Sequence, residues 1–359
     1  MALYFAGLQG DWLWITGFFA LSLVLGHLSY KLIETPTRKG LVKLSFSKQF
    51  ASFAVLALAI GISAVSVRLF TFEGRLPEAV EIAAAEAENK DPRRSECFEK
   101  AEAGSNTGCT YGDKKVGAFL FGDSHAASSI SAVGKAAENH NLGVIFYGRS
   151  SCLTFDGVIA AKETGKKATA CNHLNEWAFE KIKKYPATPL ISVSRTSSYL
   201  VGPNEPDRTD EINEISVHFG TPYKNRKDPA YITEFTGILI NTACRIAKDR
   251  PVYLMRPVPE FGTSVPRDLT RNMIYKKDFS DITITLDEYH QRNKLVWAAQ
   301  DEAAEKCGVK ILNPLPYLCD DTYCYGSKNG RPLYYDDDHL SEYGNKFLVP
   351  MFEEVFKAN

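Results

Sequence analysis

The sequence has almost no excess of charge of either sign. Its 359 residues carry 42 Lys and Arg against 43 Asp and Glu, which gives a formal net charge of −1. A protein that binds nucleic acid needs a basic face, so this balance argues against a nucleic-acid partner. The length allows one large domain or two smaller ones.

The sequence also lacks the spacing of a metal site. No cluster among its eight cysteines and seven histidines has zinc spacing, so we expect no metal. The even cysteine count favours an oxidising compartment, although a cytosolic enzyme could keep free buried thiols. Five histidines without a motif around them are interpreted as packing or surface residues: His27, His140, His173, His218 and His290.

A serine on a turn organises the rest of the chain. An apolar run, 116–121, ends at Gly122-Asp123-Ser124-His125, and a helical pattern of small residues follows over 126–137. Such a serine lies at the carboxyl end of a strand, where open α/β sheets bind ligands, and beside helix N–H groups that can hold an oxyanion. Ser124 is therefore a candidate nucleophile, with His125 as a packing neighbour. The alternative is that Asp123 or Ser124 only caps the helix.

A polar stretch near the end of the chain offers partners for this serine. Asp336 stands three residues before His339 in Tyr334-Tyr335-Asp336-Asp337-Asp338-His339-Leu340-Ser341. A nucleophilic serine needs a base that takes its proton, and the base needs a carboxylate that fixes its tautomer and stabilises the imidazolium. We predict that His339 and Asp336 fill these roles. The alternative is an acidic, solvated loop in which Asp338 or Ser341 caps the last helix.

From Val116 onward, apolar runs alternate with helical patterns, as a doubly wound α/β sheet requires. The expected strands lie near 116–121, 143–147, 190–194, 252–256 and 309–313, and the expected helices near 124–139, 174–184, 231–248, 286–307 and 342–356. The polar stretch 199–229 is long for a loop in a compact domain, and such loops are usually functional or mobile. This stretch either helps to form a groove for the molecule on which the site acts or is a solvated insertion.

The serine turn, the late Asp-x-x-His and the strand order together resemble the SGNH (GDSL-like) hydrolase family over about residues 95 to 357. The resemblance implies a three-layer α/β/α fold with a five-stranded parallel sheet. It also implies a triad of Ser124 as nucleophile, His339 as general base and Asp336 as the acid that orients it. The family's oxyanion Asn has no counterpart in the stretch 192–197, so the expected oxyanion donors are the Ser124 N–H and, as a second candidate, Gly148.

Two uncharged runs of 19 residues precede this domain, one between Asp11 and Lys31 and one between Lys48 and Arg68. Each can cross a bilayer as a helix, which takes about 20 residues. The first is not a typical signal peptide, because no basic region precedes it. The connection between the runs is rich in Lys and Arg, so the positive-inside rule places it in the cytoplasm and everything after Arg68 outside. The even cysteine count agrees with that placement.

The stretch Tyr30-Lys31-Leu32-Ile33-Glu34-Thr35-Pro36-Thr37-Arg38-Lys39 resembles the segment after the penultimate membrane helix in the membrane acyltransferase-3 family, some members of which carry a fused extracytoplasmic SGNH domain. The resemblance implies that the chain holds only the last two membrane helices and the SGNH domain. We accordingly expect a transmembrane hairpin over 1–72, a linker or extension over 73–110 and a catalytic domain over 111–359. The expected location is the inner (cytoplasmic) membrane, as a multi-pass protein with its catalytic domain in the periplasm.

The resemblance also implies the partners of the chain, which are the lipid bilayer, a membrane-embedded acyltransferase domain and a polysaccharide acceptor. No cofactor is expected on the chain itself, and the acyl donor is expected to be acetyl-CoA, acting by way of the membrane domain. The predicted function is transfer of an acyl group, with acetyl the expected one, through Ser124 onto a hydroxyl of a surface polysaccharide such as lipopolysaccharide O-antigen. The acceptor class comes from the resemblance alone.

Two other functions stay open at this point. An extracytoplasmic carbohydrate esterase would use the same triad with water as the acceptor. A catalytically inactive carbohydrate-binding or scaffolding module would use neither the triad nor water. The intact Ser, His and Asp set argues against such a module. The membrane hairpin favours the transferase, because a soluble esterase does not need one.

Proximity in the sequence suggests four disulfides, although eight cysteines allow 105 connectivities. A closed loop just before Asp336 and His339 would restrain both, and a bond at Cys152 would hold the loop of Gly148. The suggested pairs are Cys97 with Cys109, Cys152 with Cys171, Cys244 with Cys307, and Cys319 with Cys324.

Overall fold

A computed structural model describes residues 11–69, 74, 76–98, 108–276 and 280–357. The chain divides into two compact units. One comprises Met1–Glu81 with Met273–Lys277, and the other Ile82–Asn272 with Asp278–Asn359. Each unit is described by itself below.

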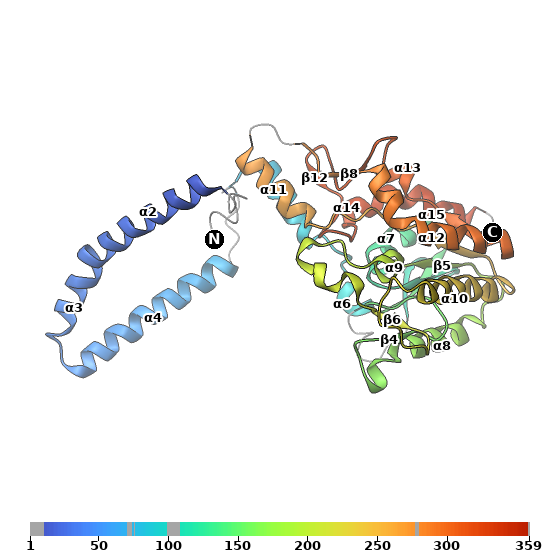
Figure 1. Cartoon of the computed structure of the whole chain (residues 1–359), viewed down its shortest axis with the longest axis horizontal. Coiled ribbons are helices and arrows are strands. Elements are labelled where there is room, and N and C mark those ends of the chain that lie inside the picture. Colours follow the sequence, from blue (N-terminus) through green and yellow to red (C-terminus); the bar gives the residue numbers. More distant parts are fainter. Residues whose placement is uncertain (1–10, 70–73, 75, 99–107, 277–279, 358–359) are drawn as a thin grey trace. The chain divides into compact units, whose positions relative to one another are not determined.

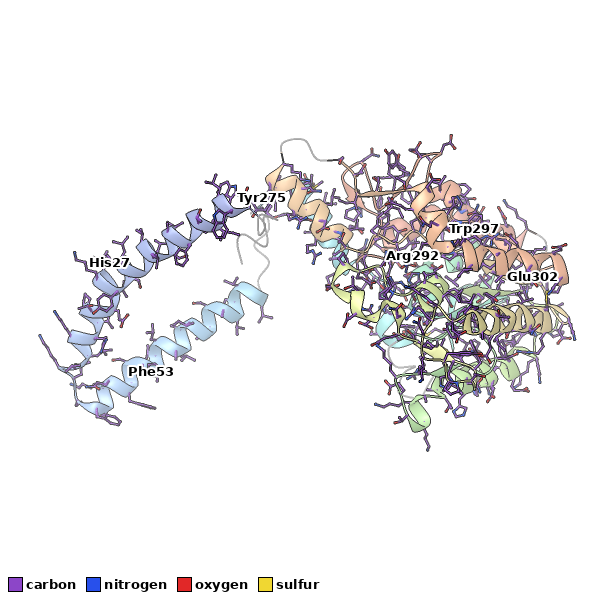
Figure 2. The ribbon with its side chains drawn as sticks, in the orientation of Figure 1. His27, Phe53, Tyr275, Arg292, Trp297 and Glu302 are labelled. Atoms are coloured by element: carbon purple, nitrogen blue, oxygen red, sulfur yellow. A yellow bond between two sulfur atoms is a disulfide. The ribbon has the colours of Figure 1, made fainter. Side chains whose placement is uncertain are left out.

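The first unit contains two long apolar helices (Figure 1). Helix α2 (Trp12–Ser29) continues through a π-helical turn, η1 (Tyr30–Glu34), into α3 (Thr35–Leu41), and α4 (Phe46–Leu69) follows. The stretches Trp12–Leu41 and Phe46–Val67 are long and apolar enough to cross a membrane, and neither is buried in the protein. Phe53 of α4, labelled in Figure 2, is 70% exposed. Apolar surface of this extent is unfavourable in water, and hydrocarbon would cover it.

The second unit is built on a six-stranded sheet of order β1-β3-β2-β5-β7-β9. Five of the strands run parallel, and β1 pairs with β3 in the antiparallel sense. All five parallel strands lie where the sequence predicts them. The edge strand β1 was not predicted, because a four-residue strand shows too little periodicity. The strands are β1 (Cys109–Gly112), β2 (Val116–Gly122), β3 (Gly143–Gly148), β5 (Leu190–Val193), β7 (Val252–Met255) and β9 (Lys310–Leu312).

Helices cover both faces of this sheet and form the three predicted layers. Side chains alternate along β2, so Leu120 packs with α7 (Ser124–Glu138) and α15 (Val349–Phe356), and Phe121 packs with the helices of the opposite face. That face carries α8 (Ala170–Ile182), α10 (Pro229–Ala247) and α12 (Leu286–Cys307). The predicted helix over 342–356 is broken into α14 (Glu342–Asn345), η6 (Lys346–Leu348) and α15, where Pro350 has no N–H for a continuous helix.

The remaining elements are short. They are α5 (Glu78–Ala85), η2 (Glu86–Glu88), α6 (Arg94–Cys97), β4 (Ile159–Ala160), η4 (Gly165–Lys167), α9 (Thr196–Val201), η5 (Pro206–Asn213), β6 (Val217–His218), α11 (Val265–Tyr275), β8 (Thr283–Thr285), α13 (Leu315–Leu318), β10 (Tyr323–Tyr325), β11 (Ser327–Lys328) and β12 (Arg331–Pro332).

The strand order creates a crevice at one edge of the sheet. The chain passes from β2 out to β3 and returns on the other side of β2 to β5, so the direction of winding reverses between β2 and β5. Open α/β sheets bind ligands outside the carboxyl ends of the strands at such a reversal. Ser124 follows β2 and Arg195 follows β5, so both lie at this edge.

The stretch predicted as a linker over 73–110 belongs in part to the catalytic unit. Phe98 is 3% exposed and stacks on Phe146 of β3, with ring centroids 6.3 Å apart. The Tyr111 hydroxyl of β1 donates a hydrogen bond of 2.6 Å to Asp91 Oδ2. The division between the two units falls at Ile82 rather than at residue 111.

All eight cysteines are in disulfides. The bonds are Cys97–Cys109, Cys152–Cys171, Cys244–Cys307 and Cys319–Cys324, the same pairs that proximity suggested. The bond between Cys244 and Cys307 joins the ends of α10 and α12 across 63 residues, whereas Cys319 and Cys324 are only 5 residues apart.

We expect these two disulfides to differ in their effect on stability. Cross-linking restricts the unfolded chain more when the closed loop is longer, so replacing Cys244 and Cys307 by Ser should lower the free energy of unfolding by about 4 kcal/mol. The matched change at Cys319 and Cys324 should lower it by about 2 kcal/mol. Urea unfolding of the full chain in detergent measures both. An equal loss, or a larger loss at the short loop, would contradict the expectation.

Candidate active site

The serine turn is held by the aspartate before the serine. Asp123 Oδ1 accepts a hydrogen bond of 2.9 Å from the His125 N–H, and Oδ2 accepts one of 2.9 Å from the Arg195 N–H. Burial raises the pKa of Asp123, against the effects of His125 and of these two N–H donors. A side chain at Gly122 would place its Cβ 1.7 Å from the Val193 carbonyl oxygen, so the turn requires glycine there. Asp123 is thus the cap of α7, and Ser124 is the first residue of that helix.

The structure brings the three predicted triad residues together. His339 Nε2 lies 2.7 Å from Ser124 Oγ, and His339 Nδ1 lies 2.9 Å from Asp336 Oδ2. The other oxygen of Asp336 accepts a hydrogen bond of 2.8 Å from the His339 N–H. This is the arrangement in which an imidazole can take the serine proton while a carboxylate fixes its tautomer.

A second carboxylate lies at the same ring nitrogen. Asp338 Oδ1 is 2.5 Å from His339 Nδ1, and the Asp338 side chain is 3% exposed, whereas that of Asp336 is 35% exposed. The spacing of the motif predicts Asp336 rather than Asp337 or Asp338 as the acid, and it does not predict that Asp338 shares the ring nitrogen. Three consecutive aspartates were visible in the sequence, but which of them face the imidazole depends on the path of the loop. A buried charge interacts more strongly than an exposed one, so Asp338 stabilises the charged form of His339 more than Asp336 does.

The carboxylates control the charge of the imidazole. Burial by itself would lower the pKa of His339, but Asp338 and then Asp336 raise it to about 10. Burial also works against the Asp338 charge, yet His339 and His125 hold the pKa of Asp338 well below its usual value. Burial, with the charges of Asp338 and Asp336, raises the pKa of Asp337 to about 6. The resting site therefore favours an imidazolium paired with Asp338.

Two aromatic rings enclose the imidazole. Tyr335 stacks almost parallel on His339, with ring centroids 5.2 Å apart and an interplanar angle of 8°. His125 lies 4.6 Å from the same ring at an angle of 48°, and its Nε2 is 3.8 Å from Asp338 Oδ1. His125 is buried beside Ser124, and the contact with Asp338 is one that the interpretation as a packing residue does not predict.

Arg195 follows β5, where the family's oxyanion Asn would be expected. Its Nη1 lies 2.6 Å from Asp338 Oδ2, and its Nε and Nη2 donate to Glu260 Oε2 at 2.9 and 2.6 Å. Glu260 also accepts a bond of 2.9 Å from Arg292 on α12, a residue labelled in Figure 2. Burial opposes the Arg195 charge, but Glu260 and Asp338 raise its pKa. Burial likewise opposes the Glu260 charge, but Arg195 and Arg292 lower its pKa. From the sequence, only the absence of the Asn was evident.

The oxyanion donors remain a prediction. Ser124 is the first residue of α7, so its N–H has no carbonyl partner within that helix. Gly148 ends β3 directly opposite Gly122, and the next N–H, of Arg149, donates to the Gly122 carbonyl oxygen at 3.2 Å. Ser151, from the same loop, lines the pocket at Ser124, whereas Gly148 does not.

A polar pocket of about 350 Å³ opens at Ser124 and His339. The stretch 199–229, which the sequence left as either groove or insertion, supplies nearly half of its lining. Lys162 lies 3.1 Å from Glu211 and 2.6 Å from Glu214, so an ion-pair cluster stands at the pocket. The other lining residues are Asp123, Ser151, Ala160, Glu163, Arg195, Ser198, Tyr199, Pro203, Arg208, Ser216, Val217 and Arg226.

Two groups at this site have the composition of metal ligands. They are His125 with Asp338 and His339, and Glu205 with Asp337 and Asp338. The guanidinium of Arg195 already lies 2.6 Å from Asp338 and 3.4 Å from Glu205. A metal ion would compete with this cation, so the donor set fits an ion-pair network better than a metal site.

The fold and the site define an α/β domain of the SGNH type. The chain belongs to a particular family of such domains, the SGNH domains fused to AT3 domains, whose model matches residues 96–354. Among solved structures, the chain is similar to the periplasmic domain of a lipopolysaccharide acetyltransferase from Salmonella ser. Paratyphi A, with 13% identity, a TM-score of 0.49, and coverage of 79% of this chain and 98% of that one. It is also similar to a carbohydrate acetylesterase from Sinorhizobium meliloti, with 13% identity, a TM-score of 0.38, and coverage of 68% and 100%. A search of curated proteins finds no match.

We expect Asp338 to set the pH dependence of any reaction that uses His339 as a base. The base acts when neutral, so activity should rise as pH passes the pKa of His339, which the carboxylates raise. Asp338→Asn should lower that pKa and move the rising limb to lower pH by about one unit or more. Hydrolysis of p-nitrophenyl acetate by the full chain in detergent gives the profile. Asp337→Asn is the matched control, and a limb that moves only in this control would contradict the assignment.

Proposed function

We propose that the chain is an O-acyltransferase that passes an acyl group, with acetyl the expected one, from Ser124 to a hydroxyl of a surface polysaccharide such as lipopolysaccharide O-antigen. The observation that carries the proposal is the Ser124–His339 contact of 2.7 Å at the end of a polar pocket. The membership in a family of SGNH domains fused to AT3 domains supports a membrane acyltransferase domain as the source of the acyl group. The two membrane-length helices support a location at the membrane.

The proposed reaction has two halves with the same base. His339 takes the Ser124 proton, Ser124 Oγ attacks the acyl carbonyl of the donor, and the donor group leaves with that proton. An acceptor hydroxyl then gives its proton to His339 and attacks the acyl-serine, and Ser124 regains the proton as it leaves. The oxyanion of each tetrahedral intermediate would be held by the Ser124 N–H, with Gly148 as the second candidate. Acetyl-CoA is the proposed original donor, by way of the membrane domain.

The pocket has the chemistry expected for a sugar acceptor. Hydroxyl groups are both donors and acceptors, so a site for them needs charged and polar side chains of both kinds. Lys162 and Arg208 supply donors, and Glu163 and Glu211 supply acceptors at the same pocket. A hydroxyl bound there would lie near the base, which is what transfer requires.

Hydrolysis is the alternative, and the same pocket favours it in one respect. A polar lining admits water, and water that reaches the acyl-serine competes with the sugar. A carbohydrate esterase would use Ser124, His339 and the carboxylates in the same way, with water as the acceptor. The two functions differ in the fate of the acyl group, which can be measured.

The measurement uses the full chain in detergent with p-nitrophenyl acetate as donor and an O-deacetylated O-antigen oligosaccharide as acceptor. The unsubstituted chain should form acetylated oligosaccharide, detected by mass spectrometry. Ser124→Ala should lose both transfer and acetate release by several orders of magnitude, because the nucleophile is gone. Ser129→Ala is the control, because it removes a hydroxyl from the same helix that donates to the His125 carbonyl oxygen and not to His339. Acetate release at an unchanged rate with acceptor present, and no acetylated oligosaccharide, would establish the esterase.

The proposed location can be tested on intact cells. We propose that the chain lies in the inner membrane, with the turn after α3 in the cytoplasm and the catalytic unit in the periplasm. All native cysteines are in disulfides, so an introduced thiol is the only free one. A membrane-impermeant maleimide should label Glu78→Cys in cells with a permeabilised outer membrane and Gly40→Cys only after lysis. The reverse pattern would place the catalytic unit in the cytoplasm.

A further inference from the structure

The segment that enters the catalytic unit, residues 86–98, is fixed to the edge of the sheet. The disulfide Cys97–Cys109 joins α6 to β1, and Phe98 lies in the core against Phe146. Arg93 Nη1 donates a hydrogen bond of 2.7 Å to the Thr110 carbonyl oxygen of β1. This end of the segment is therefore anchored covalently, by packing and by hydrogen bonds.

The same segment also holds the loop that carries the candidate base. The Asn89 carbonyl oxygen accepts a hydrogen bond of 2.8 Å from the Glu342 N–H, three residues after His339. The buried carboxylate of Glu86 accepts a hydrogen bond of 2.7 Å from Arg331 Nε, just before the loop. Contacts on both sides of the loop over 334–341 thus come from one segment far away in the sequence.

Two cations of this segment lie over the ring that stacks on the imidazole. Lys90 Nζ is 5.1 Å from the centroid of the Tyr335 ring, and the Arg94 guanidinium is 5.9 Å from it. Tyr335 itself is 7% exposed and lies nearly parallel to His339. Cations attract the face of an aromatic ring, so both side chains favour this position of Tyr335.

These cations oppose the charges that surround His339. The carboxylates of Asp336 and Asp338, from its own loop, and of Asp123, from the serine turn, favour the imidazolium. The side chain of His125 on α7 also faces the ring, and Arg195, at the end of β5, is paired with Asp338. Lys90 and Arg94 add positive charge from the side of Tyr335. Lys90 also pairs with the exposed carboxylate of Glu88 at 3.3 Å.

We infer that the segment 86–98 positions the general base, and that Lys90 and Arg94 do so by holding Tyr335 against His339. Tyr335, Lys90 and Arg94 are then positioning residues, which act on the reaction through His339 rather than on the substrate. The inference rests on the proposed function, since it takes His339 as the base. The segment is part of the catalytic apparatus and not a passive connection.

The charge change tests the role of the two cations. The double variant Lys90→Gln/Arg94→Gln, in the full chain in detergent, should lower kcat for p-nitrophenyl acetate severalfold and leave KM within about twofold. It should also move the rising limb of the pH profile to higher pH by about half a unit, because lost positive charge makes protonation of His339 easier. Arg93→Gln is the matched control, since it removes one cation from the same segment, and Arg93 lies over Tyr111 instead of Tyr335. An equal shift in this control would overturn the inference.

The ring change tests the stack. Tyr335→Leu should lower kcat about 10-fold or more, and Tyr335→Phe, which keeps the ring, should restore most of that loss. Melting temperature and circular dichroism identify any variant that fails to fold. If the Leu variant does not fold, the kcat of the Phe variant is the test, and it should stay close to the parental value because the ring is kept. Parental kcat in a folded Tyr335→Leu variant would overturn the inference.

A measurement that needs no activity separates this inference from the proposed function. Selectively labelled histidine in the full chain gives the pKa of His339 by NMR, with His339→Gln to assign the signal. A higher pKa in Lys90→Gln/Arg94→Gln, and not in Arg93→Gln, supports the inference even if no acyl reaction is found. An unchanged pKa beside normal activity in the unsubstituted chain would refute the inference and leave the proposed function intact.

Discussion

The carboxylate of Asp338 pairs with two cations, the imidazolium of His339 and the guanidinium of Arg195. The arrangement of the other charged groups at the site depends on these two ion pairs. A buried carboxylate is costly to desolvate unless strong partners replace its water. Arg195 supplies one of these partners, and its own charge is balanced by Glu260. Its backbone N–H also holds Asp123, the cap of the serine turn. One residue at the end of β5 thus connects the nucleophile's turn, the loop of the base and the stretch after β7. Removal of any one partner would leave an uncompensated charge in the others.

The sheet explains why these groups meet. The winding of the chain reverses beside β2, so the crevice at the carboxyl ends of β2 and β5 is free for ligands. The loop of His339 follows β9, at the far end of the sheet order, and must cross back to reach Ser124. It is held in that path by Arg195 from within the site and by the segment 86–98 from outside it. The polar stretch 199–229 supplies nearly half of the pocket lining. An acyl group on Ser124 would therefore face polar side chains that suit a sugar.

Local signals in the sequence predict the five parallel strands, which have apolar runs of ordinary length. Ser124 and His339 stand in short motifs whose chemistry is specific, and the structure brings them within 2.7 Å, while their catalytic roles stay a prediction. Prediction fails where the outcome depends on contacts between distant segments. The spacing of the motif predicts Asp336 at the imidazole, but the path of the loop decides which carboxylates reach the ring, and Asp338 reaches it as well. The segment 86–98 lies in the stretch predicted as a linker or extension, and its few anchoring residues, such as Phe98, are recognisable only once β1 is in place. Arg195 was overlooked because an arginine is not the residue that the family pattern requires.

The size of the pocket limits what the protein can recognise at one time. A cavity of about 350 Å³ lies at the small end of the range for small-molecule sites, and a polymer cannot fit inside it. For a polysaccharide acceptor, one short stretch of sugar would enter while the rest of the chain stayed in solvent. Each encounter would then bring one short stretch of the polymer to Ser124 and His339, and modification of a whole polymer would take many such encounters.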